Sequence, residues 1–449
     1  MSVKIPSIKG FDQGALEKYV KNTGWLMLAR VGSMVIKILA SIALTRYLSK
    51  EQFGILSYPV TFTTFFTAAA ALGVDGFVTR ELLRHPEKKN QLLGTGFILK
   101  VTGGLIIIPL IYAAYIIVNN YKTLDAPLIF IMIVSFTGLV QSFNIIDSYF
   151  QSRTQGKYIM RVQVAGNLVS AAIKLTLILI SASLQWFVIA LLLDAVLLAA
   201  GYVFIYQNNG ESIFRWTFKS DTARLLLKHS WPLAFSAILV SIYLNIDKLM
   251  IEYYIGSGAL GSYANAVQYA EAWYFIPVAI TASVFPAIMN ARRDDPVRYQ
   301  KRMQNMYDLM VWVSMAIAIG VTLTAPFIFK IVFKPEYYGG AQVLSINIWA
   351  GIFVFLGTAS SQFLIAEGYT KLSMLRTAMG ALINIVLNIF WIPKYGMAGA
   401  AFATLIAYAC ATFWILFIPK TRHQGVMMLK SLFLITLFQK LNSSADQPK

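Results

Sequence analysis

Long apolar runs alternate with short polar segments along the whole chain. Twelve of these runs are long enough to cross a bilayer as a helix, which takes about 20 residues. They lie near 22–47, 55–78, 92–118, 127–150, 158–181, 186–206, 230–255, 262–289, 308–332, 342–366, 372–393 and 396–418. The first run is longer than the apolar part of a signal peptide, and no small-residue cleavage pattern follows it. The pattern predicts an all-α integral membrane protein with about twelve transmembrane helices.

Composition and charge give the orientation. The 449 residues are 57% apolar and only 13% charged, whereas a soluble domain is about a quarter charged. The polar segments before, between and after the apolar runs alternate between the two sides of the membrane. Of the 38 Lys and Arg residues, 27 lie in the segments on the same side as the amino-terminal one, and six lie in the loops on the other side. Basic residues concentrate on the cytoplasmic side, so we expect both termini there. The same distribution explains the net charge of +18 without a nucleic-acid partner.

A polar segment near the middle divides the predicted helices into two sets of six. We expect a cytoplasmic segment at 1–21, a first lobe at 22–206, a cytoplasmic linker at 207–229, a second lobe at 230–418 and a cytoplasmic tail at 419–449. Tyr47 and Gly54 recur as Tyr254 and Gly261, which indicates a faint internal repeat. Two such lobes around a central cavity are typical of transporters. Within the tail, the run 426–438 is too short to span the membrane and suggests an interfacial helix.

Several kinds of chemistry have no motif in the sequence. No Walker A sequence, dinucleotide-binding loop or HExxH motif occurs, so we expect no ATPase activity and no bound cofactor. A single cysteine, Cys410, and three histidines in or beside polar loops predict no metal centre. Oligosaccharide polymerases and ligases typically need an outward domain, and the predicted outer loops are short. We therefore expect a protein that is not an enzyme.

Basic residues inside the apolar runs are the strongest candidates for a binding site. A charge at the centre of a transmembrane helix costs about 2.5–3.5 kcal/mol, so such residues face an interior or a water-filled space. Arg30 and Lys37 are seven residues apart, which places them on nearly the same helix face about 10 Å apart. Together with Lys174, they could bind an extended anion. In the alternative, Arg30 reaches the inner surface and Lys37 pairs with a carboxylate.

Acidic residues in the second lobe suggest ion coupling. Lys248 and Glu252 are four residues apart and can pair on one helix face. Asp247 then lies on another face as an unpaired carboxylate, which makes it a candidate site for a proton or sodium ion.

The remaining charges within the runs have structural explanations. Asp194 and Glu271 could simply pair with Lys174 or Lys37. We expect Lys100 to extend to the inner surface, as long basic side chains near helix ends do.

Four stretches resemble the Wzx-type polysaccharide-transport flippases of the multidrug/oligosaccharidyl-lipid/polysaccharide exporter superfamily. Leu44–Tyr58 reads LTRYLSKEQFGILSY and is similar to the family's turn between the first two helices. Ser230–Ile251 and Gly261–Met289 resemble its seventh and eighth helices, with a WPL motif, an Ile-Asp pair and a Phe-Pro pair. Asn384–Tyr408 resembles its eleventh and twelfth, with NIVLN, IPKYG and GAA. The resemblance extends over about 22–418.

This resemblance implies both a fold and a function. The fold would have twelve helices in two lobes, and the protein would flip a polyprenyl-diphosphate-linked oligosaccharide across the bacterial cytoplasmic membrane for surface polysaccharides such as O-antigen or capsule. Family members are described as having a cationic cavity, where Arg30, Lys37 and Lys174 would bind the lipid-linked substrate. Asp247 matches the family's acidic position, with H+ or Na+ as the coupling ion. Implied partners are membrane lipids and other polysaccharide-assembly proteins.

A second function remains open at this point. A cation-coupled multidrug exporter of the same superfamily would share the fold. Such an exporter would favour acidic and aromatic residues around a cationic drug, whereas at least three basic candidates lie within the runs here. We therefore expect the flippase function.

Overall fold

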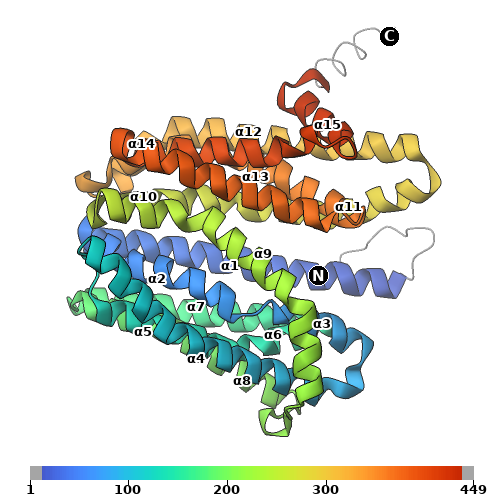
Figure 1. Ribbon diagram of the computed structural model, residues 1–449, viewed down its shortest axis with the longest axis horizontal. Helices are drawn as coiled ribbons and strands as arrows, with labels where there is room; N and C mark the ends of the chain where they lie inside the picture. Colours follow the sequence, from blue (N-terminus) through green and yellow to red (C-terminus); the bar gives the residue numbers. More distant parts are fainter. Residues whose placement is uncertain (1–12, 437–449) are drawn as a thin grey trace. The chain divides into compact units, whose positions relative to one another are not determined.

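The described part of the chain is built from helices. A computed structural model of the protein describes residues 13–436, and no strand occurs among them. The helices, labelled in Figure 1, are α1 Gln13–Tyr47, α2 Lys50–Ala70, α3 Val74–Arg84, α4 Lys89–Tyr121, α5 Leu128–Val140, α6 Ile145–Ser152, α7 Gly156–Leu179, α8 Leu184–Asn208, α9 Ser220–Tyr254, α10 Ser257–Glu271, α11 Phe275–Asp294, α12 Pro296–Val332, α13 Gly340–Ala366, α14 Thr370–Phe413 and α15 Arg422–Leu432. Short 3-10 turns occupy Pro86–Lys88, Gln141–Asn144, Ile213–Arg215, Ala272–Tyr274, Pro335–Tyr337 and Trp414–Phe417.

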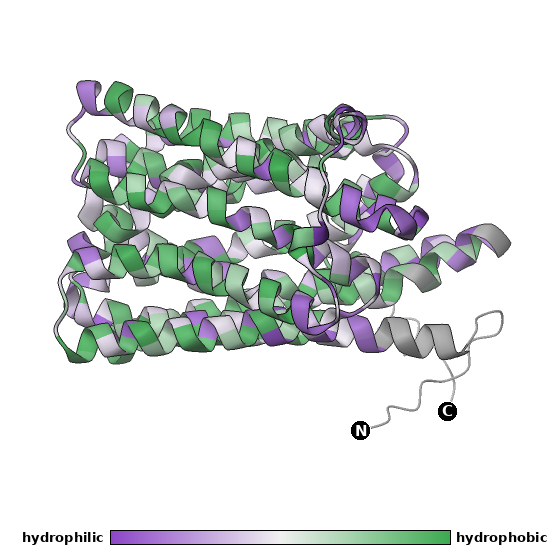
Figure 2. Ribbon diagram, turned by 90° about the horizontal axis from the view of Figure 1, so that it is seen from below, coloured by the Kyte–Doolittle hydropathy of each residue, from purple (hydrophilic) through white to green (hydrophobic). Residues whose placement is uncertain are grey.

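Eleven helical stretches of the described residues are long and apolar enough to cross a membrane. Several of them join two helices, as in Lys50–Arg84, which contains α2 and α3. Apolar residues occupy most of the length of the long helices, and polar residues gather near helix ends and in connections (Figure 2). The prediction of an all-α, multi-pass membrane protein is confirmed.

The last of these stretches contains two antiparallel helices, which accounts for the predicted number of twelve. Within α14, Gly396 has φ 60° and ψ −141°, which no helix contains, and the chain reverses there. Asn384 donates a hydrogen bond to Thr404 across the reversal (3.2 Å). The Trp391 carbonyl lies against Gly399, where a β-carbon would be 2.2 Å from its oxygen. Glycine therefore supports this hairpin twice, through its left-handed backbone at 396 and its missing side chain at 399.

The chain forms two compact units. The first contains the described residues up to Tyr47 together with Ile55–Ser241, and the second contains Leu48–Gly54 and the described residues from Ile242 onward. Helix α9 thus contributes its first part to unit 1 and its last part to unit 2. In unit 2, α13 packs against α12 and α14, and all three run side by side in Figure 1.

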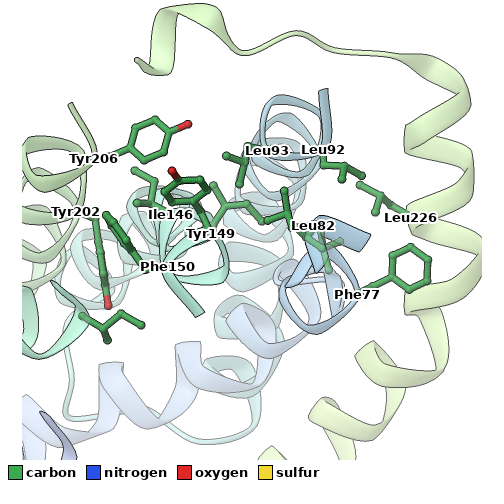
Figure 3. Packing of buried hydrophobic residues seen from close by; sticks show 14 of the residues in the cluster. Phe77, Leu82, Leu92, Leu93, Ile146, Tyr149, Phe150, Tyr202, Tyr206 and Leu226 are labelled. Carbon is green, nitrogen blue, oxygen red and sulfur yellow. The ribbon is translucent and has the colours of Figure 1, made fainter. Parts of the chain in front are cut away.

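A core of aromatic and aliphatic side chains holds unit 1 together (Figure 3). Tyr206 from α8 and Leu226 from α9 are both fully buried in it. The segment that we predicted as a linker, 207–229, comprises the end of α8, a connecting stretch and the first turns of α9. The connection is fixed to unit 1, because the Thr217 amide donates to the Asn90 carbonyl (3.2 Å) and the Trp216 indole donates to Tyr206 (3.2 Å).

The break between α2 and α3 brings the backbone of unit 1 at Gly73 close to the first part of α9. Leu72 and Gly73 both have positive φ, at 51° and 61°. A β-carbon on Gly73 would lie 2.7 Å from the Ala234 amide nitrogen of α9, so only glycine fits here.

The carboxyl-terminal helix α15 packs against α12. Tyr307 donates to Gln424 (2.9 Å), and Ser431 donates to the buried carboxylate of Asp308 (2.7 Å). Met428 of α15 is fully buried in a core that includes residues of α12 and α13. The helix begins before the run 426–438 that we expected at the membrane interface, and residues 437 and 438 of that run lie outside the described part of the chain.

Candidate functional site

Arg30 and Lys37 lie on the same side of α1, as their spacing predicts. Both side chains are exposed, and neither forms a salt bridge or hydrogen bond with any residue in 13–436. Helix α1 packs against α7, where Asn167 donates to Ser33 (2.9 Å). Lys37 is close enough to Lys174 to interact with its charge. The structure therefore brings two of the predicted cations, Lys37 and Lys174, into one region of unit 1.

Lys174 is paired. Its ammonium group donates to Asp194 on α8 (2.6 Å) and to Ser170 on α7 (3.0 Å). The two charged side chains are 14% and 30% exposed, so both are partly accessible. The structure thus supplies the pairing of Asp194 with Lys174 that we gave as the structural explanation. Because the pair is neutral, Lys37 is the cation of this region whose charge is not balanced by a salt bridge among the described residues.

Asp247 lies at the centre of a buried polar cluster in unit 2, whose hydrogen bonds the sequence pattern did not predict. It accepts hydrogen bonds from the Tyr263 hydroxyl (2.5 Å), the Lys248 amide (2.8 Å) and the Thr404 hydroxyl (3.4 Å). It forms no salt bridge within residues 13–436, and its side chain is only 5% exposed. Sequence reasoning missed these contacts because their partners lie on α10 and on the second half of α14.

Two buried amides extend the cluster. Asn384 donates to Thr404 (3.2 Å), and Asn388 donates to Asn384 (2.9 Å). Together with Asp247, these side chains offer carboxylate, amide and hydroxyl oxygens, the ligand type that hard cations prefer. No group of three or more His, Cys, Asp or Glu residues suited to a metal occurs in the described residues. The chemistry available to this cluster is the binding of a proton or an alkali cation.

The other predicted partners in unit 2 are arranged differently from the expectation. Lys248 donates to Asn245, one turn earlier on α9 (3.0 Å), and not to Glu252. Glu252 accepts a hydrogen bond from Ser257 at the start of α10 (2.7 Å). The predicted Lys248–Glu252 pair is therefore wrong. Glu271 is the last residue of α10 and is half-buried. Its carboxylate interacts with the charge of Lys248. Within residues 13–436, it forms no salt bridge with Lys174 or Lys37, the cations that we predicted as its partners.

Sequence reasoning also missed a charge cluster in unit 1. Lys100 does not extend to the surface: it is 5% exposed and donates to both oxygens of Asp75, at 2.8 and 3.0 Å. Asp147 on α6 interacts with the charges of Lys100, Asp75 and Arg30, and its buried Oδ1 has no hydrogen-bond partner. Four charges on α1, α3, α4 and α6 thus share one region, which the spacing of these residues along the chain could not reveal.

The chain is similar in sequence to membrane proteins that include polysaccharide and glycan biosynthesis proteins. An uncharacterized membrane protein of Methanocaldococcus jannaschii is 22% identical over 424 residues, covering 87% of this chain and 82% of its own length. The capsular polysaccharide biosynthesis protein CapF of Staphylococcus aureus is 20% identical over 405 residues, covering 87% and 98%. A probable low-salt glycan biosynthesis flippase of Haloferax volcanii, Agl15, is 23% identical over 194 residues, covering 42% and 40%.

The fold is that of known transporters. The lipid II flippase MurJ in an inward closed conformation superposes with a TM-score of 0.70 at 17% identity, covering 94% of this chain and 93% of that one. An inward-facing MATE multidrug transporter superposes with a TM-score of 0.72 at 13% identity, covering 91% and 96%. The two-lobed transporter fold that the sequence predicts is therefore confirmed.

Two family models match the sequence. The model for MatE proteins matches residues 232–390. The model described as polysaccharide biosynthesis protein matches residues 19–292, which is more than half of the 449 residues. The chain belongs to the polysaccharide biosynthesis protein family.

Proposed function

We propose that this protein flips a polyprenyl-diphosphate-linked oligosaccharide from the inner to the outer leaflet of the cytoplasmic membrane. The observation that carries the proposal is the pair Arg30 and Lys37, two exposed cations on one face of α1 without salt bridges in the described residues. A charged headgroup is costly to move through a low-dielectric region, and cations along its path lower that cost. Family membership and the flippases among the similar proteins support this choice of substrate.

The proposed mechanism is alternating access of the two units. Arg30 engages the diphosphate first, because a guanidinium group can hold phosphate oxygens with two parallel hydrogen bonds. Lys37, about 10 Å further along α1, then contacts the headgroup as a point charge. The prenyl tail stays in the lipid, and the headgroup leaves on the outer side. Both termini are cytoplasmic in this proposal, and other polysaccharide-assembly proteins are expected as partners.

We further propose that the buried cluster around Asp247 couples transport to a cation gradient. A carboxylate that is 5% exposed and forms no salt bridge in the described residues is stabilised by binding a proton or a sodium ion. The oxygens of Thr404, Asn384 and Asn388 suit a sodium ion, whereas protonation of Asp247 alone suffices for a proton. The geometry supports a coupling ion of either kind.

A cation-coupled multidrug exporter is the second candidate, and the match of the MatE model to residues 232–390 favours it. It would bind cationic drugs, and these would be repelled by Arg30 and Lys37, two exposed cations that form no salt bridge in the described residues. The flippase therefore fits unit 1 better.

Deletion of the gene, followed by complementation, tests the proposed function. Deletion cells should lose surface glycan and accumulate lipid-linked oligosaccharide in the inner leaflet, and the wild-type gene should restore both. Arg30→Ala should fail to restore glycan although the protein level is normal. Arg30→Lys should restore part of it, because lysine returns the charge but not the two parallel hydrogen bonds of the guanidinium group. Normal glycan in deletion cells, together with increased drug sensitivity, would contradict the flippase and favour the exporter.

A further inference from the structure

Arg376 is a buried cation in unit 2 that lies near the start of the predicted span 372–393. The structure places it on the first half of α14, six residues after the helix begins at Thr370, with 9% of its surface exposed. Its Nη2 donates to the Ser361 hydroxyl (2.5 Å) and to the Gly357 carbonyl (3.3 Å), both on α13. Its Nη1 is buried and has no hydrogen-bond partner.

No carboxylate balances this charge among residues 13–436. The ionisable groups nearest to it include the phenols of Tyr243 and Tyr307, which are neutral at physiological pH. The acidic residue at the end of α13, Glu367, already pairs with Arg292 (2.7 Å). A buried cation that lacks both an anion and one hydrogen-bond partner is strongly unfavourable. Ionisable residues of this kind within a membrane helix mark ligand pathways.

We propose that Arg376 is an anion-binding residue whose ligand is the phosphate group of a membrane-embedded lipid. A phosphate offers the negative charge and the acceptor oxygens that the Nη1 side of the guanidinium lacks. Gly357 faces this group without a side chain, since even a β-carbon there would lie 4.0 Å from both Nη atoms. Nη1 is covered in this conformation, so the anion reaches it when neighbouring groups on α13 and α14 shift.

Two lipids carry this chemistry, the diphosphate of a prenyl-linked substrate and the phosphate of an ordinary phospholipid. The first source rests on the proposed function, whereas the second does not. Either source predicts the same behaviour of Arg376, because the guanidinium recognises the phosphate oxygens of a headgroup with a net negative charge, which the zwitterionic phosphatidylcholine lacks.

Thermal unfolding of the purified full chain in a neutral detergent tests the inference. The probes are a polyprenyl diphosphate, phosphatidylglycerol and phosphatidylcholine, each added alone. We expect at least one of the first two to raise the Tm of the wild type in a saturable way. Arg376→Met should unfold at the same or a higher temperature without lipid, because it removes an uncompensated buried charge. It should lose the stabilisation by that lipid. The control is Lys371→Met, an exposed residue on the same helix with the same loss of charge, and it should keep that stabilisation.

Three results would overturn the inference. One is a wild type that neither anionic lipid stabilises, and another is an Arg376→Met variant that keeps the full lipid response. The third is an Arg376→Met variant that, without lipid, unfolds many degrees below the wild type, together with an Arg376→Lys variant that binds lipid as tightly as the wild type. We expect Arg376→Lys to bind about tenfold more weakly, because hydrogen bonds to a charged group contribute about 1.5–3 kcal/mol. A response to phosphatidylglycerol but not to the prenyl diphosphate supports Arg376 as a phosphate site while speaking against the proposed substrate.

Discussion

Gly54 of α2 and Gly261 of α10 meet in a reciprocal contact. A β-carbon on Gly54 would lie 1.8 Å from the carbonyl oxygen of Ser257, and one on Gly261 would lie 1.9 Å from the carbonyl oxygen of Lys50. Each glycine thus faces the first residue of the other helix. Gly54 and Gly261 are also the pair that indicated an internal repeat, and a reciprocal contact is what two segments related by a two-fold axis make.

Alanine at either glycine should destabilise the protein. The β-carbon would collide with backbone, which cannot move aside as a flexible side chain can, and overpacking of this kind costs about 1–3 kcal/mol. Gly54→Ala and Gly261→Ala should therefore lower the Tm of the purified protein. Gly320→Ala is the matched control, because nothing lies within 4 Å of its β-carbon position in α12. It should leave stability unchanged or raise it, and an equal loss in all three variants would contradict the steric explanation.

The pair Lys174–Asp194 allows structural and binding roles to be separated. Lys174→Met or Asp194→Leu alone leaves one charge without its partner, whereas the double variant leaves none. We expect a coupling free energy of about 0.5–3 kcal/mol in a double-mutant cycle of unfolding. If Lys174 also binds substrate, the stable double variant should still transport poorly. Full transport by the double variant would restrict this pair to a structural role.

Acid should weaken the connection between α8 and α9 through Glu211. Burial raises the pKa of this carboxyl, but hydrogen bonds from Lys89 (2.6 Å) and Tyr149 (2.9 Å) outweigh burial and hold the pKa below its ordinary value. A carboxyl with a lowered folded-state pKa stabilises the fold above its ordinary pKa, about 4.3, and loses that stabilisation as the pH falls through the lowered value.

Glu211→Gln should therefore lower the Tm at neutral pH, and its difference from the wild type should shrink as the pH falls below about 4.3. Glu51→Gln, at a side chain that is 54% exposed, serves as the control and should behave like the wild type. A Glu211→Gln difference that stays constant down to the lowest pH would show that the carboxylate charge does not stabilise this connection.

Asp247→Asn should abolish the dependence of transport on a cation gradient without lowering protein level. The amide keeps the size and most hydrogen bonds of the side chain but loses the charge that attracts a cation. Thr404→Val separates the two ions: it should weaken activation by sodium if sodium binds, and leave a proton gradient effective if a proton binds. Asp221→Asn, exposed at the start of α9, is the control. Wild-type transport that persists after both gradients are collapsed would contradict coupling through this site.

The sequence predicted the membrane fold well, because spanning a bilayer imposes long apolar runs that are visible without any tertiary information. It also paired Lys174 with Asp194 as one of its alternatives, because charges of opposite sign within apolar helices need partners. Its boundary between the last two spans is confirmed by glycine geometry. The reversal at Gly396 falls within a single stretch of helical hydrogen bonding, yet it gives the two spans that the sequence predicts.

The site was less predictable, because its contacts join distant parts of the chain. Asp247 is hydrogen-bonded to Tyr263 on the next helix and to Thr404 on the last long one, so no spacing rule along α9 could identify them. Lys248 and Glu252 have the spacing of a helical ion pair, but each finds a nearer partner. Arg376 lies within the predicted span 372–393, but its hydrogen bonds to Gly357 and Ser361 on α13 could not be read from its position in the sequence.

The most direct test of the proposed function is a flipping assay in liposomes that contain only the purified protein and a fluorescent oligosaccharide on a polyprenyl diphosphate. A membrane-impermeant reductant bleaches the label in the outer leaflet. The account predicts that the wild type raises the bleached fraction well above that of protein-free liposomes, that Arg30→Ala stays near the protein-free value, and that Arg30→Lys lies between them. The proposed function would be contradicted if folded wild-type protein, with the appropriate ion gradient applied, left the bleached fraction at the value of protein-free liposomes.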